Sequence, residues 1–501
     1  MHTGGEYPDR IAMISMHTSP LATPGLGDAG GLNVYVAELA RRLGERGLKV
    51  DVFTRRNTPE VPDIVDVHEH TRVIHLDAGP AEHVAKEALP SLTEEFCAAL
   101  EAHLGGHDLI HTHYWLSGQV GLQLKRRHGL PLVHTMHTMA RVKNSSLSRD
   151  QPVESDVRER GEAAIVHGAD VLTANTPDEA AELRSHYRAR AEQISIVPPG
   201  VDLHTFHPCN QPKSRAQFGV AQDIQVILFV GRIQPLKAPD VLIKAVAELT
   251  RRDPGRREQL QLIIIGGPSG SNGEWSQTLG PLTIDHGIQD MVDFRPHSAR
   301  SELFRWYCVS DVVAVPSYNE SFGLVALEAQ ACGRPVVATD VGGLRHTVRD
   351  HYSGLLVKGH DERQWADALA AILDDHDEMI RMGTNAAAHA ATFSWDNTAA
   401  ATLQAYRAAL RCARRLARPG HSQPQNSRQI RVGGDWFSSL RTAATNPRRS
   451  CPRQFWPDAS PDGSRRVGGR TPLARIRAAR QGWRAPGCRW AGNPNRGPAS
   501  A

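Results

Sequence analysis

Short apolar runs that alternate with helix-like segments constrain the fold of this chain more than any other feature of its sequence. Each run closes on turn or polar residues, which is the pattern of a buried strand in a parallel sheet. In chain order the runs are 10–16, 50–54, 73–76, 109–112, 132–134, 171–176, 194–202, 225–232, 260–266, 312–316 and 335–338. Apolar residues at helical spacing lie between several of them, as in 32–43 and 238–249. The alternation predicts parallel sheets with helices on both faces.

Two adjacent prolines, Pro198 and Pro199, divide this alternation into two halves, because paired prolines end both helices and strands. A chain of 501 residues is also long for a single core, so two domains are expected. We predict an α/β protein of two Rossmann-like, doubly wound domains, residues 10–196 and 197–394, that face each other across a cleft. An alanine-rich closing helix over 395–410 ends the folded part.

The last part of the chain, residues 411–501, differs sharply in composition from the rest. It contains nineteen arginines, no lysine and three acidic residues, a net charge of +16, so the preceding residues carry −12 of the total of +4. Rich in Gly, Pro and Ser, it has too little apolar surface to fold alone, and we predict a disordered tail. A basic arm for nucleic acid is the functional alternative. We favour an extension without function, such as the product of a shifted reading frame, and expect no nucleic-acid partner.

The cellular compartment and the oligomeric state are predicted from weaker features of the sequence. No run of eighteen apolar residues occurs, so no membrane span is predicted. Residues 1–10 lack the apolar core of a signal peptide, which indicates a cytoplasmic protein. A homodimer is expected because two-fold assemblies are the commonest oligomers. Reduced thiols, rather than a disulfide framework or a zinc site, are predicted from seven scattered cysteines without a Cys-x-x-Cys pair, at 97, 209, 308, 332, 412, 451 and 488.

Polar residues gather where the predicted strands end, which is where doubly wound sheets place their ligands. Residues 111–114 read His-Thr-His-Tyr, and residues 134–138 read His-Thr-Met-His-Thr. A glycine-rich loop, 17–31, follows the first strand and opens a helix, whose N-terminus favours phosphate. The loop is not Gly-x-Gly-x-x-Gly, so its Gly30–Gly31 pair indicates only that backbone comes close to another group.

A further candidate is the stretch 320–328, Glu-Ser-Phe-Gly-Leu-Val-Ala-Leu-Glu. It follows the predicted strand at 311–317, so Glu320 falls in the turn and Glu328 lies roughly two helical turns further on. Both carboxylates could accept hydrogen bonds from hydroxyl groups of one ligand. On spacing alone, an ordinary exposed pair of glutamates flanking a helix is an equally good interpretation.

Three motifs together carry a family resemblance. The segments 231–237 (Gly-Arg-Ile-Gln-Pro-Leu-Lys), 320–328 and 197–202 (Val-Pro-Pro-Gly-Val-Asp) resemble glycosyltransferase family 4, retaining enzymes of the GT-B fold, and the match spans residues 10 to about 410. The segments 28–33 and 111–118 are similar to a subgroup of that family. The subgroup transfers N-acetylglucosamine from UDP-N-acetylglucosamine to 1D-myo-inositol 3-phosphate, the first step of mycothiol biosynthesis.

The resemblance implies a role for each matching residue. Arg232 and Lys237 would neutralise the donor diphosphate, Glu328 would bind the ribose, Glu320 the sugar hydroxyls, and His137 would support the sugar. The catalytic set is thus His137, Arg232, Lys237 and Glu320. The implied donor site comprises Thr23, Pro24, Gly31, Arg232, Lys237, Ser298, Glu320 and Glu328. The implied acceptor site comprises His17, Asp28, Ala29, Gly30, Gly31, Leu32, Asn33, Lys86, Tyr114, Thr138 and Arg158.

The acceptor set suits a phosphomonoester, because a group with nearly two negative charges takes its best hydrogen bonds from Arg and Lys. Without the resemblance, Lys86 in Ala-Lys-Glu-Ala would be interpreted as a solvated helix charge. The family is thought to retain the anomeric configuration by reaction on one face of the sugar, where the leaving diphosphate helps deprotonate the attacking hydroxyl. Arg232 and Lys237 would then stabilise charge on the departing UDP, and closure of the domains would expel water.

The subgroup also carries a structural magnesium ion held largely by backbone carbonyls, and Tyr307, Cys308 and Ser310 occupy the matching positions. Arg334 stands where the resemblance implies a threonine, and a cation beside a metal ion is unfavourable. No cofactor is required for the chemistry, since Arg and Lys can neutralise the diphosphate.

Two other enzymatic functions stay open at this point. One is a family 4 transferase with a different acceptor, such as sucrose phosphate or a lipid-linked group. The other is a nucleotide-sugar epimerase of the same two-domain architecture, which would release an altered sugar without an acceptor.

Overall fold

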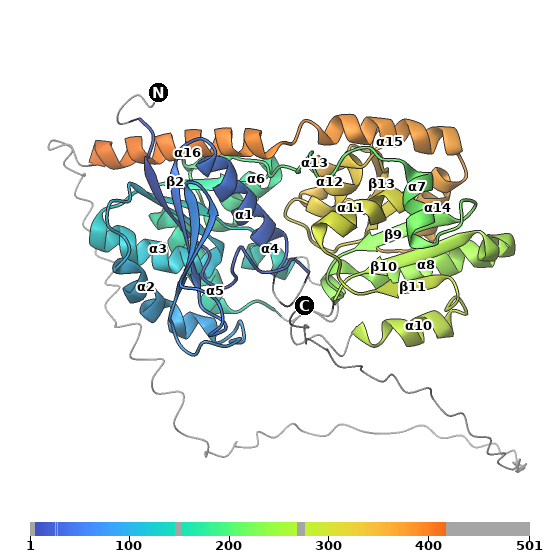
Figure 1. Ribbon diagram of the computed structural model, residues 1–501, viewed down its shortest axis with the longest axis horizontal. Coiled ribbons are helices and arrows are strands. Elements are labelled where there is room, and N and C mark those ends of the chain that lie inside the picture. Colours follow the sequence, from blue (N-terminus) through green and yellow to red (C-terminus); the bar gives the residue numbers. More distant parts are fainter. Residues whose placement is uncertain (1–5, 26, 28, 146–152, 268–275, 417–501) are drawn as a thin grey trace, which may run out of the picture. The chain divides into compact units, whose positions relative to one another are not determined.

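The computed structural model describes residues 6–25, 27, 29–145, 153–267 and 276–416 (Figure 1). Asp28 and the predicted tail from residue 417 onward lie outside the described residues. The tail prediction is wrong for 411–416, because these residues continue the last helix.

An eight-stranded sheet occupies the first half of the chain, in the order β3-β4-β2-β1-β5-β6-β7-β8. All neighbouring strands are parallel except β3, which pairs antiparallel with β4 at the edge. The strands are β1 (Arg10–Ile14), β2 (Lys49–Arg55), β3 (Ile64–His68), β4 (Thr71–Leu76), β5 (Leu109–His113), β6 (Leu132–Thr135), β7 (Val171–Ala174) and β8 (Ile194–Ile196).

A six-stranded, wholly parallel sheet occupies the second half, in the order β11-β10-β9-β12-β13-β14. Its strands are β9 (Gln225–Val230), β10 (Leu260–Ile265), β11 (Val292–Arg295), β12 (Val312–Val315), β13 (Val336–Thr339) and β14 (Gly354–Val357). The prediction of two Rossmann-like α/β halves is therefore confirmed.

Helices connect the strands and cover both sheets (Figure 1). Those of the first half are α1 (Gly31–Gly44), α2 (Thr93–Glu101), α3 (Tyr114–His128), α4 (Ala140–Ser145), α5 (Asp156–Gly168) and α6 (Pro177–Tyr187). Those that follow are α7 (Gln211–Phe218), α8 (Pro239–Arg252), α10 (Leu279–Asp285), α11 (Arg300–Val309), α12 (Leu324–Ala331), α13 (Leu344–Thr347), α14 (Glu362–Leu373), α15 (His376–Ala390) and α16 (Trp395–Leu416). None of these described helices has the length and apolar composition that a bilayer-spanning segment requires.

The strand order of each sheet reverses once, between β1 and β5 in the first and between β9 and β12 in the second. Loops that leave the carboxyl ends of strands at such a point diverge and leave a crevice, which is the usual ligand site of doubly wound sheets. Loops begin after β1, β9 and β12, at residues 14, 230 and 315, whereas α3 follows β5 directly at Tyr114. They contain the glycine-rich loop and most of the motifs that the sequence singles out.

The last helix, α16, packs against α1 and the strands β6 and β7 of the first sheet, although it follows the second sheet in the chain. Figure 1 shows it, in orange, beside the blue α1. Trp395 and Tyr406 are fully buried in this contact, and the Tyr406 hydroxyl bonds His111 Nδ1 at 2.8 Å. A Cβ atom at Gly200 would meet the Trp395 backbone nitrogen at 2.2 Å, so the linker accepts only glycine there.

Candidate active site

A cavity of about 1910 Å³, open to solvent, is lined by loops from the carboxyl ends of both sheets. Fourteen residues of the implied site line it: His17, Pro24, Gly30, Gly31, Leu32, Lys86, Tyr114, His137, Thr138, Arg232, Lys237, Ser298, Glu320 and Glu328. Thr23, Ala29, Asn33 and Arg158 are described but do not line it, and Asp28 lies outside the described residues. The fold thus gathers most of the set from seven separate segments of the chain.

The glycine-rich loop lies directly against the second half of the chain. A Cβ atom at Gly30 would come within 3.8 Å of the Arg232 guanidinium, and one at Gly31 within 3.5 Å of Leu324 on α12. Asn33 faces inward instead of toward the cavity: its Oδ1 accepts from the Gly30 N–H at 2.9 Å and its Nδ2 donates to Thr18 Oγ1 at 2.7 Å. Asn33 therefore fixes the loop that the cavity uses.

The segment after β9 supplies the two cations of the implied donor site, Arg232 and Lys237. A Cβ atom at Gly266, at the end of β10, would meet the Gly231 carbonyl oxygen at 1.8 Å, so the two strand ends can approach only because Gly266 has no side chain. Lys237 follows, and its ammonium group forms an ion pair with the Glu320 carboxylate. Without a ligand, the positive charge that would bind a diphosphate is thus neutralised by a carboxylate on the neighbouring loop.

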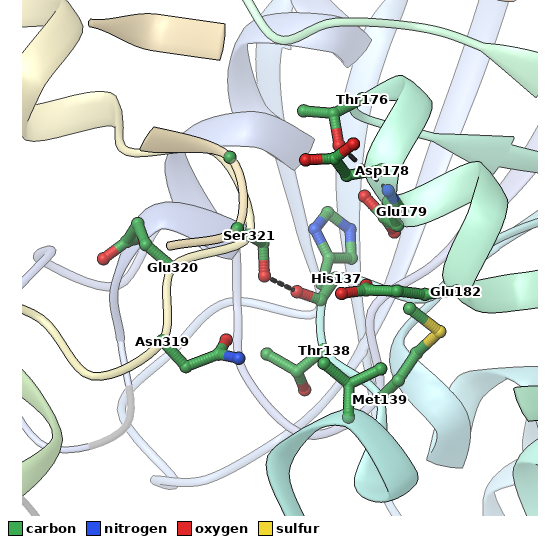
Figure 2. A pocket seen from close by; sticks show the side chains of 13 residues that line it. His137, Thr138, Met139, Thr176, Asp178, Glu179, Glu182, Asn319, Glu320 and Ser321 are labelled. Carbon is green, nitrogen blue, oxygen red and sulfur yellow. Dashed lines mark hydrogen bonds between the residues drawn. The ribbon is translucent and has the colours of Figure 1, made fainter. Parts of the chain in front are cut away.

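The turn that holds Glu320 rests on a second glycine pair. The Gly343 N–H donates to the Glu320 carbonyl oxygen at 2.8 Å. A Cβ atom at Gly342 would meet the same oxygen at 2.4 Å, and one at Gly343 would meet the Phe322 Cα at 2.3 Å. The hydroxyl of Ser321 in this turn donates to the His137 carbonyl oxygen, which joins the two halves at the cavity (Figure 2).

Glu328 is a buried carboxylate, 8% exposed, that lines the cavity from α12. The Tyr307 hydroxyl donates to its Oε2 at 3.0 Å, and Arg300 Nη2 lies 3.4 Å from its Oε1. Burial raises the pKa of Glu328, and the Arg300 charge and the Tyr307 hydroxyl partly offset that rise. Arg300 also reaches Glu38 of α1 at 2.9 Å. Sequence reasoning missed these roles of Arg300 and the Tyr307 side chain, because both depend on contacts between distant segments.

His137 follows β6 in the left-handed region, with φ of 61°. A side chain that carries a Cβ adopts this conformation only where its surroundings impose it, and such strain collects at functional sites. Its Nε2 bonds His113 Nδ1 at 3.0 Å, and its ring meets Tyr35 edge-on. Burial lowers the pKa of His137 to about 3, so the ring is neutral at pH 7 and can donate from one nitrogen only.

The implied acceptor residues gather around Tyr114, which also has a positive φ, 70°. The cationic groups of Lys86 and Arg158 each lie 5.0 Å from the centre of its ring, and the His17 ring packs at 4.4 Å. Arg158 Nη2 donates to Thr138 Oγ1 at 2.9 Å. The implied phosphate ligands are therefore brought together, with cation–π contacts that hold two of them.

A smaller pocket, with about 390 Å³ of space that includes open solvent, shares His137, Thr138, Glu320 and Ser321 with this site (Figure 2). Carboxylates from α6 line it, and the most buried of these belongs to Glu179. Burial raises the pKa of Glu179 to about 8, although the Asn175 N–H donates to it at 2.8 Å. This glutamate is therefore protonated at neutral pH.

The comparison with known proteins agrees with this geometry. The chain matches the family models described as "Glycosyl transferase 4-like domain" over residues 30–200 and "Glycosyl transferases group 1" over residues 210–389. The D-inositol 3-phosphate glycosyltransferase of Kineococcus radiotolerans is 50% identical over 426 residues, which cover 82% of this chain and 98% of that relative. This chain belongs to the D-inositol 3-phosphate glycosyltransferase family.

Other relatives fit the same assignment. The family member from Nocardia farcinica is 49% identical over 410 residues, 81% of this chain and 90% of that protein. Among solved structures, sucrose-phosphate synthase from Thermosynechococcus elongatus is 35% identical with a TM-score of 0.74, and the match covers 80% of this chain and 98% of that one. The epimerase alternative is therefore set aside, and the chain is a glycosyltransferase.

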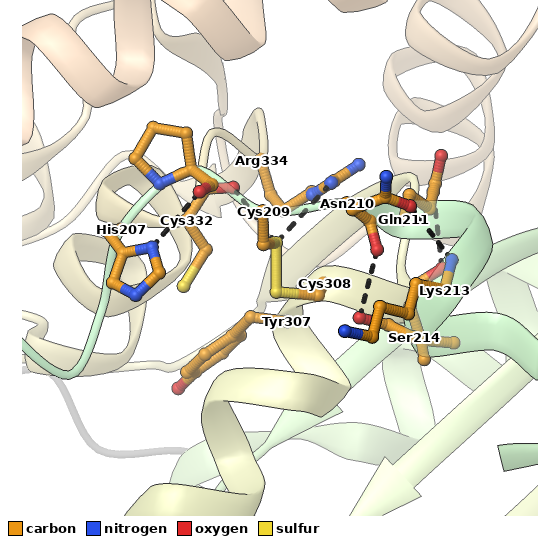
Figure 3. The surroundings of a disulfide bond; sticks show 12 residues. His207, Cys209, Asn210, Gln211, Lys213, Ser214, Tyr307, Cys308, Cys332 and Arg334 are labelled. Carbon is orange, nitrogen blue, oxygen red and sulfur yellow. Dashed lines mark hydrogen bonds between the residues drawn. A yellow bond between two sulfur atoms is a disulfide. The ribbon is translucent and has the colours of Figure 1, made fainter. Parts of the chain in front are cut away.

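One sequence prediction is overturned beside the donor site. Cys209 and Cys308 form a disulfide with a Cα–Cα distance of 5.9 Å, so the expectation that all thiols are reduced is wrong for this pair (Figure 3). The two cysteines are 99 residues apart in the sequence, and no spacing rule reveals that α11 and the start of α7 bring them together. Cys97, Cys332 and Cys412 are free among the described cysteines.

The same region does not fit the implied magnesium ion. The Tyr307 carbonyl oxygen accepts from Ser310 Oγ at 2.9 Å, and the Ser310 carbonyl oxygen accepts from Gln211 Nε2 at 3.0 Å. The Arg334 guanidinium lies at the disulfide, 3.9 Å from Cys209 Sγ (Figure 3). These hydrogen bonds compete with a metal ion for the carbonyl oxygens, and the positive charge of Arg334 in this region disfavours a divalent cation. The described residues also contain no cluster of three His, Cys, Asp or Glu side chains that could hold a metal.

Proposed function

We propose that this glycosyltransferase moves N-acetylglucosamine from UDP-N-acetylglucosamine to 1D-myo-inositol 3-phosphate with retention of the anomeric configuration, the first step of mycothiol biosynthesis. The observation that carries the proposal is the pair of cationic sites on one cavity. Arg232, Lys237 and the buried Glu328 line this cavity, and so does Lys86, which lies with Arg158 against the Tyr114 ring. Two phosphorylated substrates therefore have separate places in a shared space.

Each donor residue has a distinct chemical task in this proposal. Arg232 and Lys237 stabilise the negative charge that grows on the diphosphate as the glycosidic bond breaks. Glu328, whose carboxylate oxygens are oriented by Tyr307 and Arg300, accepts hydrogen bonds from the ribose hydroxyls. Glu320 exchanges its ion pair with Lys237 for hydroxyl groups of the sugar.

Deprotonation of the acceptor does not require a protein base. The leaving diphosphate oxygen takes the proton from the attacking hydroxyl on the same face of the sugar, so bond breaking and proton transfer support each other. His137, neutral at pH 7 because burial lowers its pKa, holds the sugar by a hydrogen bond and does not compete for this proton. Closure of the cavity around both substrates excludes water that would otherwise hydrolyse the donor.

The decisive experiment combines the full chain, UDP-N-acetylglucosamine and 1D-myo-inositol 3-phosphate. The expected product has the mass of the inositol phosphate plus one N-acetylglucosaminyl residue, which is the sum of the two molecules less one water, and it has the α configuration of the donor by NMR. Release of free N-acetylglucosamine alone, or transfer to unphosphorylated inositol at the same rate, would contradict the proposal. Arg158→Ala should weaken the acceptor much more than the donor, and equal losses for both would count against the acceptor assignment.

A different phosphorylated acceptor is the second candidate, and the 35% identity to a sucrose-phosphate synthase supports it. A competition assay with a set of sugar phosphates separates the two candidates by their ratios of kcat/KM. The proposal also includes a cytoplasmic location and a homodimer, of which the homodimer is tested by light scattering of the purified protein. The disulfide Cys209–Cys308 is unusual for a cytoplasmic protein and makes its thiol content worth titrating.

A further inference from the structure

The acceptor side of the cavity contains a lysine and a glutamate that the family resemblance does not assign. Lys143, on α4, lines the cavity beside Lys86, Tyr114 and Thr138. Its ammonium group forms an ion pair with Oε1 of Glu154, just before α5, and the same oxygen lies 2.8 Å from Arg158 Nη1. One carboxylate oxygen therefore lies between two cations of the acceptor site.

Lys143 and Arg158 differ in how far their side chains are exposed to solvent. The Arg158 side chain is only 3% exposed and does not line the cavity, whereas the Lys143 side chain is 25% exposed and does. Arg158 has Glu162 on its Nε at 2.8 Å and Thr138 on its Nη2 at 2.9 Å. Its buried Nη1 is close to Glu154 but makes no hydrogen bond of good geometry. This Nη1 group thus has donor capacity that Glu154 does not satisfy.

The positive charges around Glu154 indicate that its carboxylate occupies the position of an anionic ligand. Burial alone would raise the pKa of Glu154, but the charges of Arg158, Lys143 and Lys86 hold this pKa at about 2. Burial and the neighbouring charges of Arg158 and Lys86 lower the pKa of Lys143, and the negative charge of Glu154 partly offsets this fall. Three cations therefore act on the carboxylate of Glu154, although Glu162 also pairs with Arg158, and a phosphomonoester with nearly two negative charges would satisfy Lys143, Lys86 and the Arg158 Nη1 group better than Glu154 does.

From this arrangement we infer that Lys143 is a further ligand of the acceptor's phosphate and that Glu154 is an internal counter-ion which the phosphate displaces. The inference rests on the proposed function for the identity of the acceptor, but only on the cation cluster for its anion. When phosphate binds, Lys143 and Arg158 exchange the Glu154 oxygen for phosphate oxygens. Glu154 keeps the cluster ordered in the free enzyme and lowers its affinity for weak anions.

The test measures binding to the full chain by titration calorimetry, with inorganic phosphate and with 1D-myo-inositol 3-phosphate, each in the presence of UDP. Lys143→Gln should weaken the inositol phosphate roughly ten- to a hundredfold, the effect of losing one charge-assisted hydrogen bond. Glu154→Gln keeps the shape of the side chain and removes the competing charge, so both ligands should bind roughly fivefold more tightly, about 1 kcal/mol. The affinity for UDP alone should not change in either variant.

Matched controls lie on the same two helices. Arg141 and Glu159 form an ion pair at 3.3 Å and do not line the cavity. Arg141→Gln and Glu159→Gln should therefore leave both affinities unchanged. They also reveal any general loosening of α4 and α5, which thermal unfolding of all four variants measures independently.

The outcomes separate this inference from the proposed function. Weaker phosphate binding by Glu154→Gln would overturn the inference, because it would make Glu154 a support for Lys143 and Arg158 instead of a competitor. Unchanged binding by Lys143→Gln would overturn it as well. If the inositol phosphate fails to bind but inorganic phosphate follows the expected order among the variants, the inference stands and the acceptor identity fails. If neither ligand binds the wild type, both fail.

Discussion

The hydroxyl of Tyr307 gives the sharpest test of the donor site. It donates to Glu328 Oε2 at 3.0 Å inside the protein, and the other contact to this carboxylate, from Arg300 Nη2, is long at 3.4 Å. Tyr307→Phe removes only the hydroxyl and leaves the ring in its apolar surroundings. The buried carboxylate then lacks its best donor and is free to rotate away from the ribose.

The expected size follows from the kind of bond that is lost. A hydrogen bond to a charged group contributes ~1.5–3 kcal/mol, which corresponds to roughly a ten- to hundredfold rise in the KM for the donor. Because the Tyr307 hydroxyl lowers the pKa of Glu328, its removal raises that already elevated pKa further. The donor KM of the variant should therefore begin to rise at a higher pH than that of the wild type as the solution is made acidic.

The assay is steady-state kinetics with each substrate varied in turn between pH 5 and 8, together with UDP binding. Tyr406→Phe is the control, since it also loses a buried hydroxyl, the one that bonds His111, but does not line the cavity. It should lose stability without a change in donor KM. The assignment of Glu328 to the ribose is refuted if Tyr307→Phe raises the acceptor KM as much as the donor KM. It is also refuted if the variant changes neither KM.

Three further changes test other parts of the site. Gly266→Ala places a Cβ atom 1.8 Å from the Gly231 carbonyl oxygen, so we expect a lower melting temperature and weaker UDP binding, measured by thermal unfolding with and without UDP. Lys237→Met should lower kcat by roughly a hundredfold or more, since it removes charge stabilisation in the transition state, and a change confined to KM would contradict this role. Glu179 has a pKa raised by burial to about 8, so folding is most favourable below the pKa of the unfolded chain and loses stability as pH rises toward 8. Glu179→Gln cannot ionise and should lose less stability than the wild type between pH 5 and 8.5, as denaturant unfolding would show.

Periodicity reveals all the inner strands and one edge strand, β8, and misses the other three strands at the sheet edges. Each apolar run that the sequence singles out coincides with a strand of the structure, because parallel strands covered on both faces need continuous apolar residues. The missed strands are the antiparallel edge strand β3, which is largely exposed, and the outer strands β11 and β14. β3 and β11 contain no fully buried residue, so their sequences resemble those of loops, whereas β14 is apolar and largely buried but only four residues long.

The residues of the site also fall into those that the sequence predicts and those that it does not. Residues in strand-end loops, such as Tyr114 and Arg232, follow from the position of the strands and from the motif. Arg300, Lys143 and Glu154 do not, because each acquires its role from a partner in another segment, as Arg300 does from Glu38 and Glu328. The only signal for Lys143 was its place on the first helix after Thr138, where a side chain can reach back to the strand end.

Both ligand sites contain a cation that is neutralised within the protein, but the two carboxylates differ in what they do afterwards. In the proposed function, the donor diphosphate takes Lys237 from Glu320, and Glu320, which lines the cavity, then accepts hydrogen bonds from the sugar hydroxyls. On the acceptor side, the phosphate takes Lys143 and Arg158 from Glu154, which does not line the cavity and has no substrate group to bind.

Replacement of the two carboxylates by glutamine should therefore have opposite effects. Glu320→Gln should lower kcat because the sugar loses a charged partner, whereas Glu154→Gln should lower the acceptor KM with kcat unchanged. A fall in kcat for both variants would mean that Glu154 contacts the reacting groups, and the displacement of an internal counter-ion would no longer describe the acceptor site.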